Sequence, residues 1–242
     1  MSEPTARTAA DAYLDCAHLL LERLRETQRD HIERAAQACA DAVSSDRLLY
    51  TTGSGHSFLV AAEAFHRAGG LACIALIPDF TFGRGERVEG YARHLLADAK
   101  PLPGGVLFVV SNSGRNAFPV EMALAGREHE LTVVAVTSLP HSQSRPAGHS
   151  SGKRLFEAAD LVLDSGVPAG DAALTLPGVP EPVGPMSVVA GCILMNATLV
   201  RAVELLAGRG IEPPVLRSAN VAGGDEKNQA LDAKYAHHRR GW

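Results

Sequence analysis

The chain has 242 residues, of which 46% are hydrophobic and 21% are charged, as expected for a soluble globular protein with a sizeable core. Its 27 acidic residues outnumber its 23 basic ones, and the formal charge of -4 argues against sequence-independent binding to nucleic acid. Four cysteines without a CxxC pair, no apolar signal-like start and no run of 18 apolar residues favour a protein of the reducing cytoplasm, without a disulfide framework or a membrane span.

Apolar residues at three- and four-residue steps predict a helix over residues 8–44, with a break near Gln28. We expect this N-terminal helical segment, 1–44, to pack on the core or on a partner, and 45–242 to form the main domain with a C-terminal extension. Strand patterns follow at 48–53, 71–77, 105–111, 132–138 and 161–164, and helix patterns at 58–69, 90–99 and 118–130. Residues 187–209 predict a long, mostly apolar helix. This alternation predicts a three-layer α/β/α, flavodoxin-like doubly wound parallel sheet of about five strands.

Small polar residues and glycines follow three of the predicted strands, in TTGSGHS (51–57), SNSGRN (111–116) and TSLPHS (137–142). The carboxyl ends of parallel strands meet at one edge of a sheet, so the three segments can converge on one pocket. Hydroxyl and N–H donors at a helix start favour an anion, and we expect Ser111, Ser113 and Asn116 to hold a phosphate. The alternative is that these residues only cap helices and form turns. Neither GxGxxG nor GxxxxGK[ST] is present.

These residues resemble those of the sugar isomerase (SIS) domain family of phosphosugar-binding proteins. GSGHS and SNSGRN are similar to its sugar and phosphate loops. The longer segments GSGHSFLVAAEAFHRAGGLA, HSSGKR, GDAAL and EPPVLRSANVAGGDEKN resemble a narrower branch, that of the actinobacterial N-acetylglucosamine-6-phosphate dehydratases. The broader family includes aldose-ketose isomerases and an N-acetylmuramic acid 6-phosphate etherase. The resemblance implies a phosphorylated amino sugar as ligand, and a homodimer or larger homo-oligomer with a shared active site.

The expected substrate-binding residues lie in the strand-end loops and in the C-terminal segment 218–228. They are Ser54, Gly55, His56, Ser57, Ser111, Asn112, Ser113, Arg115, Asn116, Ser138, Asn220 and Glu226. In SANVAGGDEKN, two glycines with Asn220, Asp225, Glu226 and Asn228 fit a ligand-binding loop, but a helix N-cap with Asp225 and Glu226 in the first turn fits equally well. In HSSGKR, Lys153 either binds phosphate or merely ends a loop.

Glu63 and His66 are the expected catalytic residues. Isomerisation and elimination on an open-chain sugar both begin with removal of a proton next to the carbonyl, which needs a carboxylate or an imidazole as base. Glu63 lies in the apolar segment VAAEAFH, where desolvation would raise its pKa, and His66 lies at i+3 on the same predicted helical face. A structural ion pair is the alternative role for Glu63. Glu63-x-x-His66 is also half of a carboxylate-bridged metal site, but no second ExxH exists, so we expect neither a metal nor another cofactor.

Two classes of function follow. The first is an enzyme that dehydrates N-acetylglucosamine 6-phosphate across C2 and C3, with aldose-ketose isomerisation as the nearest chemical alternative. The second is a phosphosugar sensor without catalysis, which is less favoured because residues 1–45 show no helix-turn-helix pattern.

Overall fold

A parallel sheet of five strands forms the centre of the computed structural model, which describes residues 7–235. Its strands are β1 (Leu49–Gly53), β2 (Ile74–Pro78), β3 (Val106–Val110), β4 (Thr132–Thr137) and β5 (Leu161–Asp164). They pair in the order β2-β1-β3-β4-β5, with Leu49 opposite both Ile74 and Val106. This is the flavodoxin-like order, so the predicted doubly wound sheet is confirmed.

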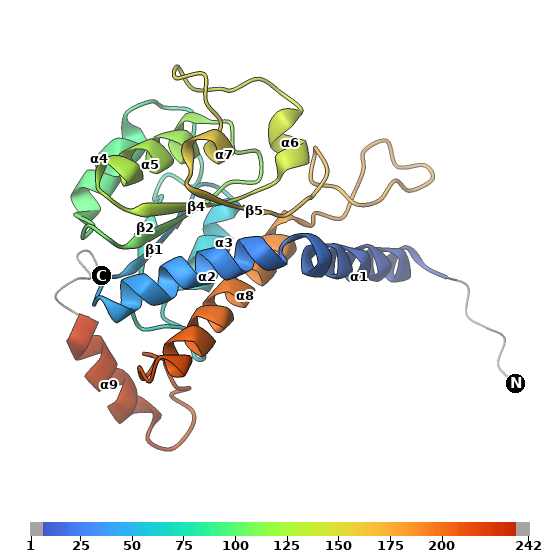
Figure 1. Cartoon of the computed structure of the whole chain (residues 1–242). Coiled ribbons are helices and arrows are strands. Elements are labelled where there is room, and N and C mark those ends of the chain that lie inside the picture. The colour runs from blue at the N-terminus through green and yellow to red at the C-terminus, as the bar shows by residue number, and fades with distance from the viewer. Residues whose placement is uncertain (1–6, 236–242) are drawn as a thin grey trace, which may run out of the picture.

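Helices cover both faces of the sheet (Figure 1). One face carries α2 (Arg29–Ser44), α3 (Ser57–Glu63) and α8 (Ser187–Gly208), and the other carries α4 (Tyr91–Ala99), α5 (Ala117–Glu128) and α7 (Leu155–Ala158). Every residue of β1 and β3 is buried, which explains why these strands lack polar alternation. The hydrophobic core therefore occupies both sides of the sheet.

The N-terminal helical segment divides at Gln28, as the sequence predicts. The first helix, α1 (Ala9–Thr27), begins with a capping box in which Thr8 and Asp11 exchange hydrogen bonds, and it projects from the body of the molecule (Figure 1). Leu24 is its one fully buried residue, whereas α2 buries a stripe of small residues, Ala35, Ala36, Cys39, Ala40 and Ala42, against α8 and the sheet. The second half of segment 1–44 is thus part of the core.

Helix α3 is shorter than the pattern predicts. It ends at Glu63, and His66 has a φ of +43°, which a right-handed helix cannot contain. The chain turns here because Gly69 and Ala72 donate backbone hydrogen bonds to Leu216 and Pro214. Tertiary pairing therefore overrides the helical pattern of residues 64–69, and the prediction that Glu63 and His66 share a helical face is wrong.

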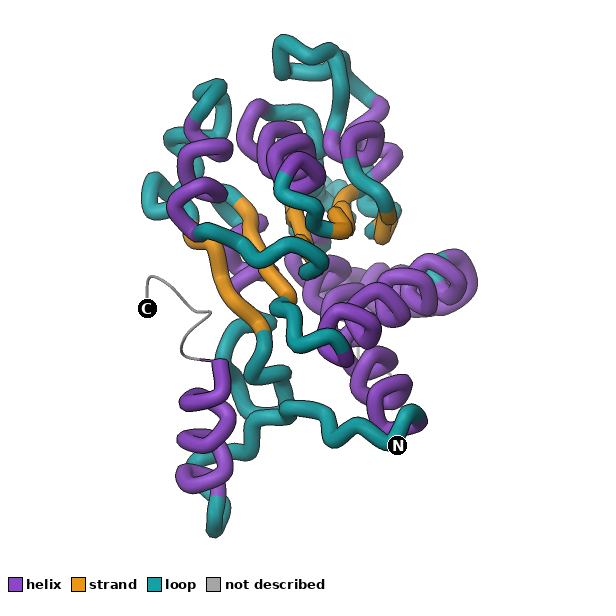
Figure 2. The backbone as a smooth tube through the Cα atoms, turned by 60° about the vertical axis from the view of Figure 1, so that its left-hand side comes forward, coloured by secondary structure: helices purple, strands orange, loops and turns teal. Residues whose placement is uncertain are grey.

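Helix α8 is, within residues 7–235, the one helix whose length and apolarity would suffice to cross a membrane. This is weak evidence for a membrane span, since core helices of soluble proteins pass the same test. Here α8 packs against α2, α3 and β4. The last helix of the described residues, α9 (Gly224–Tyr235), lies to one side of the sheet in Figures 1 and 2, and its final residue, Tyr235, is buried against the core.

Candidate functional site

The candidate site lies at the carboxyl edge of the sheet, where β1 is flanked by β2 and β3. The strand order reverses between β1 and β3, and open α/β sheets bind ligands beside such a switch point. The GSGHS and SNSGRN loops follow these two strands. The sheet therefore places the two predicted phosphosugar loops next to each other.

The GSGHS loop is a tight strand-to-helix turn anchored by Asp79. A Cβ atom at Gly53 would lie 2.6 Å from the Ser57 carbonyl oxygen, so only glycine fits there. Buried Ser54 donates its hydroxyl to Asp79 Oδ2 at 2.7 Å. His56 is exposed, and Ser57, half-buried, begins α3. Ser54 thus supports the loop, while His56 and Ser57 are the side chains that it presents outward.

The SNSGRN loop is held in shape by the hydroxyl of its own Ser111 and by close packing against Thr137 of β4. Ser111 Oγ accepts a hydrogen bond from the Gly114 N–H at 3.1 Å. Gly114 has a φ of +57°, and a Cβ there would lie 2.8 Å from Thr137 Oγ1. Arg115 turns away, with Nε donating to the Pro146 carbonyl, and Asn116 precedes α5 without a side-chain cap. Half-buried Ser113 remains beside this helix start, where the Phe118 N–H already donates to the Glu86 carbonyl at 3.0 Å.

Asn112 connects the loop to His141, which belongs to the short helix α6 (Leu139–Gln143) after β4. Ser165 donates its hydroxyl to Asn112 Oδ1, so the amide nitrogen of Asn112 faces His141 Nδ1, at 3.1 Å. Nδ1 of His141 then accepts a hydrogen bond from the Asn112 amide, and the ring proton is on Nε2. Burial lowers the pKa of His141, and the positive charges of Arg145 and Arg115 add to this against the opposing effect of Asp171. His141 is therefore an uncharged donor at the edge of the site.

Ser138 and the start of α8 also lie at this edge, but their polar groups already form hydrogen bonds with other groups of the protein. Buried Ser138 donates to the Val167 carbonyl at 2.5 Å and accepts from the His141 N–H, so its hydroxyl caps α6. At α8, the Asp171 carboxylate accepts hydrogen bonds from the Met186 and Ser187 N–H groups. The dipole of α8 is thus satisfied by a carboxylate of the chain itself.

The space enclosed between these elements is about 10 Å³, room for one water molecule. It is lined by Ser57, Val60, Val110, Asn112, Val136, Thr137, Ser165, Ser187, Val188 and Gly191. This space is too small for a sugar phosphate. A larger hollow of about 680 Å³ lies between α1, α2 and α8 and shares no residue with the loops.

Glu63 and His66 lie away from the strand-end loops. Glu63 is the last residue of α3, about 9 Å along the helix from Ser57 at 1.5 Å per residue. Its carboxylate is paired with Arg67 and accepts a hydrogen bond from the Asn196 side chain at 3.0 Å. His66 Nε2 is 3.1 Å from Asp232 Oδ1 on α9. Glu63 thus contacts α8 and His66 contacts α9, and neither is hydrogen-bonded to the GSGHS or SNSGRN loop among the contacts of the described residues.

Asn220 and Glu226 also lie apart from the strand-end loops. Both are exposed, and α9 begins at Gly224 with Asp225 and Glu226 in its first turn, as the helix-start alternative expects. Lys234 of α9 pairs with Asp46, just before β1, so the helix runs beside the amino edge of the sheet. Among residues 7–235, no three His, Cys, Asp or Glu side chains are grouped so as to hold a metal ion.

The SIS domain family model matches residues 12–138, just over half of the chain. The chain belongs to the SIS domain family. A UPF0309 protein of Streptomyces griseus is 42% identical over 237 residues, which covers 93% of this chain and 94% of the relative. A UPF0309 protein of Listeria monocytogenes is 39% identical and covers 93% and 96%.

Solved structures share the fold of this SIS domain. Phosphoheptose isomerase GmhA from Neisseria gonorrhoeae superposes with a TM-score of 0.56 at 16% identity, over 81% of this chain and 97% of the isomerase. The Vibrio vulnificus NanR protein, complexed with ManNAc-6P, gives a TM-score of 0.53 at 16% identity, over 98% and 72%. At such identities the likeness establishes the α/β architecture.

Several residues at the edge of the site were not predicted. Asp79 and Ser165 follow β2 and β5 directly, so the same strand-end reasoning applied to these two strands would have found them. His141 lies inside the TSLPHS segment, but only the structure shows that its ring contacts Asn112. Asp171 reaches α8 from a long loop, and no local pattern indicates that contact.

Proposed function

We propose that the protein is a cytoplasmic lyase that dehydrates an N-acetylhexosamine 6-phosphate, with N-acetylglucosamine 6-phosphate as substrate and without a cofactor. The observation that carries this proposal is that GSGHS and SNSGRN meet at the switch point of the sheet, with Ser57, Ser113 and the start of α5 in these loops and directly after them. The names of structural neighbours support a phosphorylated sugar, since one is a phosphoheptose isomerase and another is complexed with ManNAc-6P. Phosphate would bind at Ser111, Ser113 and Asn116.

The reaction removes one water molecule from the open-chain sugar. The C1 aldehyde acidifies the C2 hydrogen, a base takes that proton, and the C3 hydroxyl leaves with a proton from an acid. A C2–C3 double bond conjugated to the aldehyde results. Glu63 is the proposed base, and His66 the proposed acid.

A second copy of the chain would supply these catalytic groups. Glu63 ends α3, His66 contacts α9, and Glu226 lies in the first turn of α9. Asn220 lies just before α9, whereas the proposed phosphate loops are at the carboxyl edge of the sheet. A homodimer with a shared active site would bring the two sets together. Apolar surface is available for association, since Leu14 and Leu19 of α1 and Val200 of α8 are 65%, 62% and 67% exposed.

Aldose-ketose isomerisation is the second candidate, because it begins with the same proton removal and structural neighbours carry isomerase names. The two reactions differ in mass balance, since only dehydration lowers the product mass by one water. A non-catalytic sensor, as the ManNAc-6P complex of NanR would suggest, binds the sugar without turnover.

The test is to incubate the purified protein and its Glu63→Gln variant with N-acetylglucosamine 6-phosphate and to record mass and ultraviolet absorbance. The parent should form an unsaturated product. The variant should be about two to four orders of magnitude slower with little change in affinity, because an amide cannot accept the proton. A product of unchanged mass would assign isomerisation, and binding without turnover would assign a sensor. Turnover by the variant close to that of the parent would remove Glu63 from the mechanism.

A further inference from the structure

The residues on either side of HSSGKR (149–154), Gly148 and Leu155, hold two carbonyl groups of the SNSGRN loop. The Gly148 N–H donates to the Arg115 carbonyl at 2.8 Å, and the Leu155 N–H donates to the Gly114 carbonyl at 2.7 Å. A trans peptide points its N–H opposite to its carbonyl. Fixing these two carbonyls therefore aims the N–H groups of Arg115 and Asn116 away from the segment.

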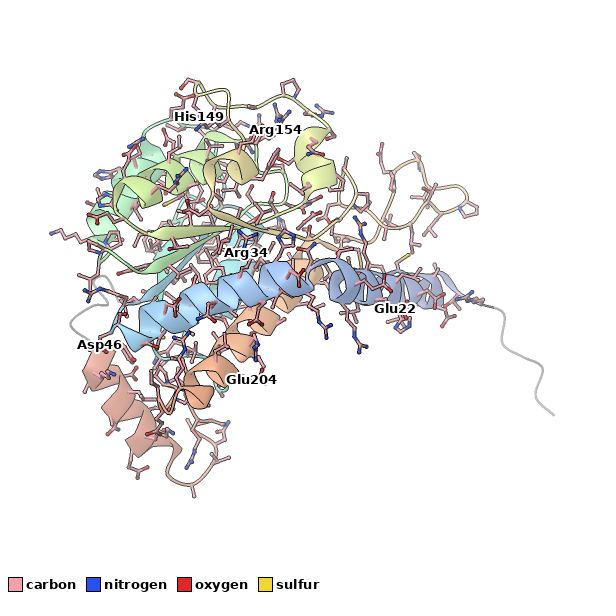
Figure 3. All side chains as sticks on the ribbon, viewed as in Figure 1. Glu22, Arg34, Asp46, His149, Arg154 and Glu204 are labelled. Carbon is pink, nitrogen blue, oxygen red and sulfur yellow. The ribbon has the colours of Figure 1, made fainter. Side chains whose placement is uncertain are left out.

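His149 anchors this segment to the protein beneath it. Its side chain is 9% exposed, and Nε2 lies 3.6 Å from Glu121 Oε1 and 3.9 Å from Glu89 Oε2. The Ser151 N–H donates to Nδ1, so Nε2 carries the ring proton and faces the two carboxylates. Figure 3 shows His149 on the loop that arches over this side of the molecule.

The carboxylates that His149 faces come from two separate elements. Glu121, on α5, is 4% exposed, and its Oε1 accepts from the Gly90 N–H at 2.6 Å. Its Oε2 is buried without a hydrogen-bond partner among the residues described. Glu89 accepts from both the N–H and the hydroxyl of Ser150. The Glu121 oxygen nearest to His149 Nε2 is Oε1, so His149 lies beside both carboxylates, at 3.6 and 3.9 Å, without a hydrogen bond to either.

We propose that His149 is a positioning residue for phosphate binding. By facing Glu89 and Glu121 it holds the HSSGKR segment in place, and the segment in turn orients the N–H groups of the SNSGRN loop for the anion. This inference rests on the proposed phosphosugar site. It gives HSSGKR a supporting role through its histidine, in place of the direct phosphate contact considered for Lys153.

The test compares His149→Leu with His149→Gln, which retains an N–H donor. The Leu variant should raise both the KM for N-acetylglucosamine 6-phosphate and the inhibition constant of inorganic phosphate by one common factor, roughly threefold to tenfold, as expected when a contact between buried polar groups is lost. Its kcat should stay within about twofold of the parent, as expected when only ground-state binding is weakened. Amide hydrogen exchange at Gly148 and Leu155 should accelerate. The Gln variant should restore most of the lost binding and most of the lost amide protection. His94→Leu, on the exposed face of α4, should change neither binding nor amide protection.

Unchanged constants and unchanged amide protection in the Leu variant would overturn the inference, as would a loss confined to kcat. If the parent binds neither ligand, the proposed phosphosugar site fails, and amide exchange still decides whether His149 holds the segment. Should His149→Leu fail to fold, Ser150→Ala loosens the same segment from the Glu89 side, and its KM and phosphate inhibition constant should rise together by a smaller factor. No change in that variant would likewise contradict the role of the segment.

Discussion

Asp79 is the residue on which the first candidate phosphate loop depends. It accepts hydrogen bonds from the Ser54 hydroxyl, from the N–H and hydroxyl of Thr81, from the Gly83 N–H and from the Tyr91 hydroxyl. Burial acts to raise the pKa of Asp79, but the hydrogen bonds from Thr81, Ser54 and Tyr91 together outweigh burial and hold the pKa below its ordinary value. The ionised form is therefore the one that the fold stabilises.

This depressed pKa predicts a specific acid sensitivity. A carboxyl group whose pKa is lower in the folded state stabilises the protein above its unfolded pKa, and this contribution disappears as pH falls below about 4 and through the folded pKa. Asp79→Asn should therefore reduce the free energy of unfolding at neutral pH, and its deficit relative to the parent should shrink in that acid range. Urea unfolding at several pH values measures the difference. A deficit that does not change with pH would show that the charge of Asp79 contributes nothing.

The sequence identifies which residue types surround the site, but not how each polar group is used. Ser54, Ser113 and Ser138 look equivalent in a list of strand-end serines. In the structure, the Ser54 hydroxyl donates to Asp79 and the Ser138 hydroxyl donates to the Val167 carbonyl, partners 25 and 29 residues away, about which local patterns carry no information. The cap that Ser138 provides for α6 is local, since it accepts from the His141 N–H three residues on.

At the scale of elements, strands and long helices could be predicted because burial imposes a period on them. The strand at 161–164 has the predicted bounds, and α8 ends one residue before its prediction. Helix α3 could not be bounded this way, since its end is set by pairing with Leu216, far along the chain. That same contact separates His66 from the helical face on which the sequence placed it.

The start of α8 offers a matched pair of variants. Asp171 has a φ of +56° and receives the N–H groups of Met186 and Ser187, at 3.0 and 2.7 Å. Asp171→Ala should lower the free energy of unfolding by about 1 kcal/mol through the lost cap, and the positive φ adds strain for alanine. Asp171→Asn keeps an acceptor and tolerates this conformation, so it should lose much less. Equal urea midpoints for the two variants would contradict the capping role, and Asp98→Ala on exposed α4 serves as control.

At the scale of the whole molecule, the residues proposed for binding and for catalysis occupy different parts of one subunit. The phosphate loops are at the carboxyl edge, while Glu63 and His66 contact α8 and α9. The resemblance to SIS proteins implies an oligomer with a shared site, and the sequence alone gave no reason to divide the residues into two sets. The division comes from the direction of α3, which leads away from the loop that precedes it.

Mixing two inactive variants tests whether the sets are shared between subunits. Ser113→Asp should prevent phosphate binding by charge repulsion, and Glu63→Gln should remove the base. A mixed dimer then contains one site with both native residues, so random reassembly of equal amounts should restore about a quarter of the parent activity. The readout is turnover of N-acetylglucosamine 6-phosphate after mixing, with each variant alone as control. Absence of recovery, with exchange of subunits verified by mass, would place each complete site within one chain.

Because α3 leads away from the loop that precedes it, the activity per chain would depend on the concentration of the protein. If the base enters from a neighbour, an isolated chain has no working site, and the fraction of working sites follows the association equilibrium of the subunits. Specific activity would then fall on dilution instead of staying constant. Near the dissociation constant, doubling the concentration of chains would more than double the rate, so the amount of protein synthesised would set a threshold for the proposed reaction.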